Sequence, residues 1–173
     1  MIWAERRPVR RPYSASVSDP AIDAAREILG GSLDAMRQAI VGAPPELLNW
    51  RPAGDDTNPI AVLAVHALSS TRWWLTVAIT GVAPERDRPA EFRTTVSNAE
   101  ELLRVADPLA AECRLLLEAG GAFDPGASRT DPSGGATVTA AWALIHAVEH
   151  LQEHVAHAEL TRQVWDRAAA GTD

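Results

Sequence analysis

Apolar side chains recur at helical spacing in four separate stretches of the chain. The first stretch follows Asp19-Pro20, a cap residue with proline at the first helical position, and predicts a helix to about Val41. Its apolar stripe is Ile22, Ala25, Ile28, Leu29, Leu33, Met36 and Ile40. Asn58-Pro59 repeats this combination of cap residue and proline and predicts the start of the second helix. That helix should run to Thr80, because Gly81 follows as a helix terminator.

The second half of the chain carries two more helical patterns. A capping box at Ser97-x-x-Glu100 predicts a third helix that reaches about Ala119. Its apolar set is Leu102, Leu103, Val105, Leu109, Cys113, Leu116 and Leu117. The fourth helix should start near Thr137 or Thr139, be the longest of the four, and end near Ala168.

The segments between these helices are rich in turn residues. Residues 82–95 combine charge with proline and predict a surface loop, and residues 123–135 predict a second irregular linker. No strand-like alternation is evident. The fold class is therefore all-α, a four-helix bundle over residues 19–169. Residues 1–18 carry four arginines and no apolar periodicity, which predicts a flexible Arg-rich tail.

Composition narrows the functional classes. A chain of 173 residues is the size of one domain, and its net charge of −7 argues against nucleic-acid binding. A single cysteine excludes an internal disulfide and favours the reducing cytoplasm. No run of 18 apolar residues predicts a membrane span, and the first residues do not resemble a secretory signal. All sixteen basic residues are arginine, so lysine chemistry is excluded.

Four of the five histidines lie in the predicted fourth helix. His146, His150, His154 and His157 are spaced by four, four and three, which places their side chains in a stripe roughly 80° wide. Unliganded imidazoles buried in such a stripe would leave many donors and acceptors without partners. Histidine-rich tracts are a recognised sign of metal binding, so we interpret the stripe as a metal site.

One ion cannot take all four of these histidines. The stripe rises about 16 Å along the helix, so a neighbouring pair must supply two ligands. Spacing alone permits three pairs: His146 with His150, His150 with His154, or His154 with His157. The third ligand must come from elsewhere, and His66 is the one remaining histidine. It shares a face of the second helix with apolar residues, which predicts that it points inward.

Two segments of the chain resemble the DinB/YfiT-like metalloproteins. These are NPIAVLAVHALSSTRWW, around His66, and HAVEHLQEHVAHAELTRQ, in the fourth helix. The resemblance implies that His66, His150 and His154 are the metal ligands. It also implies an up-down-down-up bundle in which residues 82–95 cross over between the second and third helices, and a homodimer.

Residues next to these histidines have candidate roles as well. His157 takes the place of a pocket residue and, with Glu153, is a candidate for moving protons in catalysis. His146 lies one turn away and is expected to pack beside the ligands. Glu149 and Glu153 flank the ligands and could orient an imidazole; the alternative is that both are exposed glutamates on a solvated helix.

Three neutral imidazoles with an open coordination position suit a divalent metal, Zn²⁺ or Ni²⁺ first and Fe²⁺ as a further possibility. The resemblance points to a small-molecule enzyme that transfers a low-molecular-weight thiol, because some relatives are similar to thiol S-transferases or to a mycothiol-dependent isomerase. Two alternatives stay open. One is a metal-dependent hydrolase. The other is a non-enzymatic dimeric binding or stress-response protein that holds a structural metal.

Overall fold

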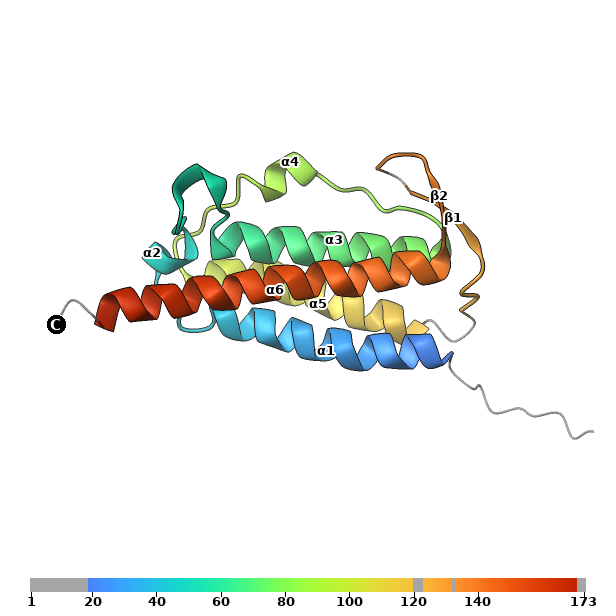
Figure 1. Ribbon diagram of the computed structural model, residues 1–173, viewed down its shortest axis with the longest axis horizontal. Coiled ribbons are helices and arrows are strands. Elements are labelled where there is room, and N and C mark those ends of the chain that lie inside the picture. Colours follow the sequence, from blue (N-terminus) through green and yellow to red (C-terminus); the bar gives the residue numbers. More distant parts are fainter. Residues whose placement is uncertain (1–18, 120–122, 132, 171–173) are drawn as a thin grey trace, which may run out of the picture.

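Four long helices make up most of the protein (Figure 1). The computed structural model describes residues 19–119, 123–131 and 133–170, so the predicted tail over residues 1–18 lies outside the described residues. The long helices are α1 (Pro20–Ile40), α3 (Ile60–Thr80), α5 (Ala99–Ala119) and α6 (Ala140–Ala170). The expected mostly helical class is confirmed, and α6 is the longest helix of the described part of the chain, as predicted.

The four helices pack in a defined pattern of neighbours. Both α3 and α1 pack against α5 and α6, and they touch each other much less. The connection between α1 and α3 contains the short helix α2 (Pro45–Leu48) and the 3₁₀ turn η1 (Gly54–Asp56). The connection from α3 to α5 returns along the bundle past the short helix α4 (Arg88–Glu91) (Figure 1). A returning connection of this kind is what the predicted up-down-down-up order requires.

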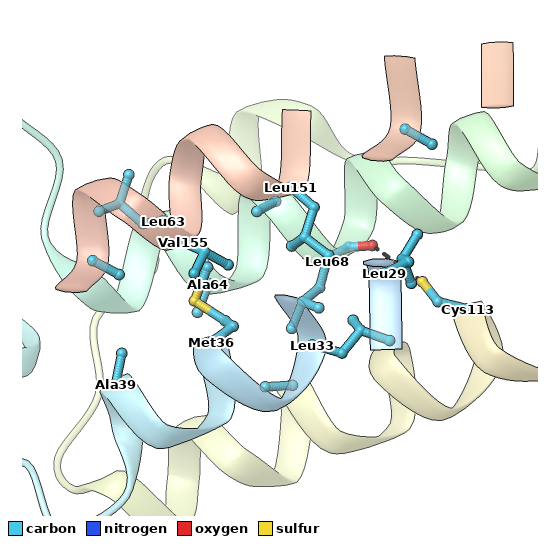
Figure 2. Close-up of a cluster of buried hydrophobic side chains, with 14 of the residues drawn as sticks. Leu29, Leu33, Met36, Ala39, Leu63, Ala64, Leu68, Cys113, Leu151 and Val155 are labelled. Atoms are coloured by element: carbon cyan, nitrogen blue, oxygen red, sulfur yellow. Dashed lines mark hydrogen bonds between the residues drawn. The ribbon is translucent and has the colours of Figure 1, made fainter. Parts of the chain in front are cut away.

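The hydrophobic core lies between α1, α3, α5 and α6 (Figure 2). Leu29 and Met36 of α1 and Leu68 of α3 are almost fully buried, and each such side chain stabilises the fold by about 1.5–3 kcal/mol. Cys113 is also in this core, where its thiol lies 4.0 Å from the carbonyl oxygen of Leu68. Burial raises the pKa of Cys113 to about 12, so it is a packing residue and not a nucleophile.

Two predicted core positions are wrong. Ile28 of α1 and Val105 of α5 were both assigned to apolar stripes, yet each is 46% exposed. Both residues lie at the edge of the apolar stripe of their helix, where side chains point away from the neighbouring helices. The core of α5 uses Ala106 in place of Val105.

α3 is the most enclosed helix of the bundle. Its buried residues occur on nearly all sides, because α5, α6 and the returning connection cover it. His66 is 6% exposed and therefore points inward, as the sequence predicted. Within the described ranges, no helix is both long and apolar enough to cross a membrane.

Two helix starts differ from the sequence prediction. Asn58 does not cap α3, because Pro59 occupies the cap position and no side chain bonds to the helix end. The capping box of α5 lies one residue later than predicted. Asn98 Oδ1 accepts the backbone N–H of Glu101 at 2.8 Å, and Glu101 Oε2 accepts the backbone N–H of Ser97 at 2.7 Å.

A small hairpin precedes α6 and begins within the predicted irregular linker. Strands β1 (Ser128–Thr130) and β2 (Thr137–Thr139) pair antiparallel. β2 occupies the residues at which the fourth helix was predicted to start, and α6 begins directly after it at Ala140. Three residues a strand are too few to show alternation in the sequence. The Arg129 side chain donates to the carbonyl of Ala78 at 3.0 Å and ties the hairpin to α3. In Figure 1 the hairpin lies on the same side of α3 and α6 as α4.

Candidate metal centre

The packing of α3 against α6 brings three histidines together. His66 projects from α3, while His150 and His154 lie one turn apart on α6. The ring centroid of His66 is 5.1 Å from those of both His150 and His154, which are themselves 4.5 Å apart. One ligand atom from each of the three lies within 4.8 Å of the other two. This three-histidine group could hold a metal ion.

A hydrogen bond fixes the ring of His66. Its Nδ1 lies 2.9 Å from Oε2 of Glu91, the last residue of α4 and itself only 5% exposed. An ionised carboxylate can only accept, so the imidazole proton belongs on Nδ1. The lone pair is then on Nε2, which is the form of histidine that a metal requires.

Arg86 keeps this carboxylate charged. Its Nε donates to Glu91 Oε1 at 2.7 Å and its Nη2 donates to Glu91 Oε2 at 2.8 Å, a bidentate pair that is largely buried. Burial raises the pKa of Glu91, but the hydrogen bonds from His66 and Arg86 outweigh it, and the net effect is a lowered pKa. Glu91 is therefore ionised at neutral pH.

His150 and His154 are held in the neutral state. Burial, followed by the nearby imidazoles, lowers the pKa of His150 to about 3 and that of His154 to about 4. Each ring also has a buried Nδ1 with no hydrogen-bond partner in the described part of the chain. An unsatisfied buried nitrogen costs about 1–3 kcal/mol. Neutral, unpartnered imidazoles facing one another form a donor set that fits a divalent metal.

Comparison with known families agrees with this geometry. A family model of the DinB superfamily matches residues 28–158, a range that includes all three histidines and most of the bundle. The chain belongs to the DinB superfamily. The resemblance stated from the sequence is thereby confirmed. Searches of curated proteins and of solved structures found no match.

The other two histidines of α6 lie outside the group in this DinB-superfamily chain. His146 is half-buried and stacks on Trp142, with ring centroids 4.9 Å apart, while His150 is 5.9 Å away. His157 is exposed, and its ring centroid is 6.0 Å from that of His154. Both rings are therefore neighbours of the group, one turn or less along the helix on either side.

The two glutamates predicted near the site are on the outer side of α6. Glu149 is exposed and lies 3.7 Å from Nδ1 of His146, and Glu153 is exposed as well. Within the described ranges, no hydrogen bond joins either carboxylate to His66, His150 or His154. The carboxylate that does contact the group is Glu91, which sequence reasoning missed.

Glu91 and Arg86 lie in the segment that was predicted to be a surface loop. That prediction is wrong at Glu91, because α4 turns its carboxylate into the bundle. The one sequence signal is Phe92, an apolar residue in an otherwise charged stretch. The Phe92 ring packs against the His66 ring with centroids 4.5 Å apart, and this contact anchors α4 on α3.

Cavities open on both sides of the three histidines. One, of about 460 Å³, is lined by His154 and His157 together with Leu63, Thr57 and Thr161. The other, of about 500 Å³, is lined by His66 and His150 together with two tryptophans and two arginines. Both volumes fall within the range of small-molecule sites.

The lowered pKa values predict how stability depends on pH in metal-free protein. A histidine in the unfolded chain has a pKa near 6.5, so between about pH 6.5 and pH 4 the unfolded state binds more protons at His150 and His154 than the folded state. Stability should therefore fall as the pH is lowered through this window. Urea unfolding of metal-free wild type and of His150→Gln measures the effect, and the variant should show a shallower dependence.

The matched control for that measurement is His157→Gln, which removes an exposed imidazole from the same helix. His157 contributes least of the three causes that lower the pKa of His154, so this variant should change the pH dependence of stability much less than His150→Gln does. Equal slopes for the wild type and His150→Gln would show that His150 titrates normally in the folded protein.

Proposed function

We propose that His66, His150 and His154 ligate a divalent metal, Zn²⁺ or Ni²⁺ first, with Fe²⁺ as a further possibility. The observation that carries this proposal is the convergence of three largely buried imidazoles, from two helices, with ligand atoms within 4.8 Å of one another. Neutral imidazole is a ligand that all three metals accept. The orienting carboxylate on His66 is the arrangement that metal-binding histidines usually have.

We further propose that the site is catalytic. Structural zinc sites are usually closed by four protein ligands, whereas catalytic sites have three and an open position. Three histidines form the group, and His157, the residue that could close it, is exposed and apart from it. This supports an enzyme over a binding or stress-response protein with a structural metal.

The chemistry proposed is transfer of a low-molecular-weight thiol to a small electrophile. A divalent ion in the site would lower the pKa of a bound thiol or water. Cavities on both sides of the group support a reaction of two substrates. The sulfur–carbon bond forms as the bond to the leaving group breaks, and the thiol proton passes to a base, for which His157 in the cavity beside His154 is the candidate.

Metal-dependent hydrolysis is the second candidate. It is favoured by the same position of His157, which could take a proton from water at the His154 side of the group. Glu153 is exposed and has less support for this role. The homodimer and the cytoplasmic location stay predictions that rest on the resemblance and on the single cysteine.

Loss of one ligand tests the metal assignment. His150→Ala should reduce the bound zinc from about one ion per chain to almost none, because two imidazoles hold the ion far more weakly than three. Metal analysis of protein purified after zinc loading gives the result. His157→Ala is the control and should bind as much zinc as the wild type. An unchanged zinc content in His150→Ala would remove this residue from the site.

Glu91→Gln tests the orienting carboxylate. The variant keeps the shape of the side chain but removes the charge that holds the proton of His66 on Nδ1 and pairs with Arg86. Zinc affinity should fall by about 10–100-fold, as measured by competition with a fluorescent chelator. Glu85→Gln changes an exposed side chain in the same segment and should not alter the zinc affinity. Equal affinities for both variants would contradict the role of Glu91.

Thiol transfer is tested by incubating zinc-loaded protein with monochlorobimane and mycothiol, bacillithiol or glutathione in turn. At least one thiol should react faster than with metal-free protein, and His150→Ala should abolish the difference. No acceleration with any thiol, together with metal-dependent release of nitrophenol from p-nitrophenyl acetate, would favour the hydrolase. No activity in either assay would favour the binding protein.

A further inference from the structure

The cavity on the His66 and His150 side has an aromatic wall. Trp73 and Trp74 of α3 and His146 of α6 all line it. Trp74 contacts both of the others edge to face, with centroids 5.2 Å from Trp73 and 4.9 Å from His146. The indole N–H of Trp73 is already bonded to the carbonyl of Pro84 at 3.0 Å. Trp74 is only 5% exposed, so the open ring surface of the wall comes mainly from Trp73 and His146, and it favours a flat apolar or aromatic group.

The same cavity holds two arginines, and they differ in their partners. Arg86 is neutralised by its bidentate pair with Glu91. Arg88 lines the cavity too, and in the described part of the chain its guanidinium has no ion pair and no hydrogen bond. Its Cζ lies 4.8 Å from the ring centroid of Phe92, which in turn packs on His66. A cation–π contact of this kind holds the guanidinium in place and leaves its N–H groups available.

Among the described residues that line this cavity there is no carboxylate, although the chain as a whole carries a net charge of −7. The Arg88 guanidinium therefore gives its side of the cavity a local positive charge. A single planar guanidinium matches a carboxylate, which it can bind with two parallel hydrogen bonds. A phosphate would be expected to meet more than one free cation.

We propose that this cavity binds a small aromatic carboxylate, with its carboxylate at Arg88 and its ring against Trp73 and His146. The proposal rests on the proposed function in one respect: the cavity shares His66 and His150 with the metal centre, so the bound molecule would be the substrate presented to it. Recognition itself depends on Arg88 and on the aromatic wall, and not on the metal. A volume of about 500 Å³ suits a molecule with one or two rings.

The test uses calorimetric titration of the full chain with 2-naphthoate, 2-naphthamide and acetate. Metal-free protein is used first, so that the carboxylate cannot gain affinity from a metal. Wild type should bind 2-naphthoate at least about tenfold more tightly than 2-naphthamide, which lacks the charge, and than acetate, which lacks the ring. Arg88→Gln should remove the preference for naphthoate over naphthamide. Arg93→Gln removes an exposed charge five residues away, outside the cavity, and should retain it.

Equal binding of naphthoate and naphthamide by the wild type, or equal affinities in Arg88→Gln and Arg93→Gln, would overturn the proposal. Tighter binding of 2-naphthyl phosphate than of 2-naphthoate would overturn the assignment to carboxylates. Zinc loading of the same protein variants in a separate experiment, followed by metal analysis, reports on the metal independently. Protein that binds naphthoate through Arg88 but takes up no zinc would support this inference and contradict the proposed function. Protein that takes up zinc but does not bind naphthoate through Arg88 would support the proposed function and contradict this inference.

Discussion

The hydrogen bond between His66 and Glu91 is the interaction on which the site depends. It holds the imidazole proton on Nδ1 at a separation of 2.9 Å and so leaves the lone pair on the other nitrogen. It also provides a shared acceptor for two donors, since Arg86 Nη2 lies only 3.3 Å from the same ring nitrogen and both groups donate to Glu91 Oε2. Without the carboxylate, a guanidinium and an imidazole would face each other in a buried place. Removing one partner of such a buried network is strongly destabilising.

The helices and the loop contribute different parts of the site. Three imidazoles come from α3 and α6, long helices whose mutual packing fixes their separation, and rigid elements of this kind place ligands more accurately than loops. The orienting pair, Glu91 and Arg86, comes from the connection that returns across α3. Burial serves the site in two ways. It keeps His150 and His154 neutral, and it strengthens the ion pair that fixes His66.

The helical part of this arrangement could be predicted because it depends on local periodicity. Apolar spacing indicated the four long helices, and the position of His66 on the apolar face of its helix indicated that it points inward. The spacing on α6 left three pairs open, and the DinB resemblance selected His150 and His154. The structure brings those two close to His66. Glu91 could not be found in this way, because its burial depends on how a short loop turn docks on α3. The hairpin was missed because its strands are too short for a period to appear.

The most direct test of this account is a crystal structure of the zinc-loaded protein, supported by X-ray absorption at the zinc edge. We expect three imidazole nitrogens at about 2.0–2.1 Å from the ion, from His66, His150 and His154, with His66 bound through Nε2 while its Nδ1 stays hydrogen-bonded to Glu91. A fourth ligand other than water or a small molecule would contradict the open site. Zinc bound without His66, or bound directly by Glu91, would contradict the account as a whole.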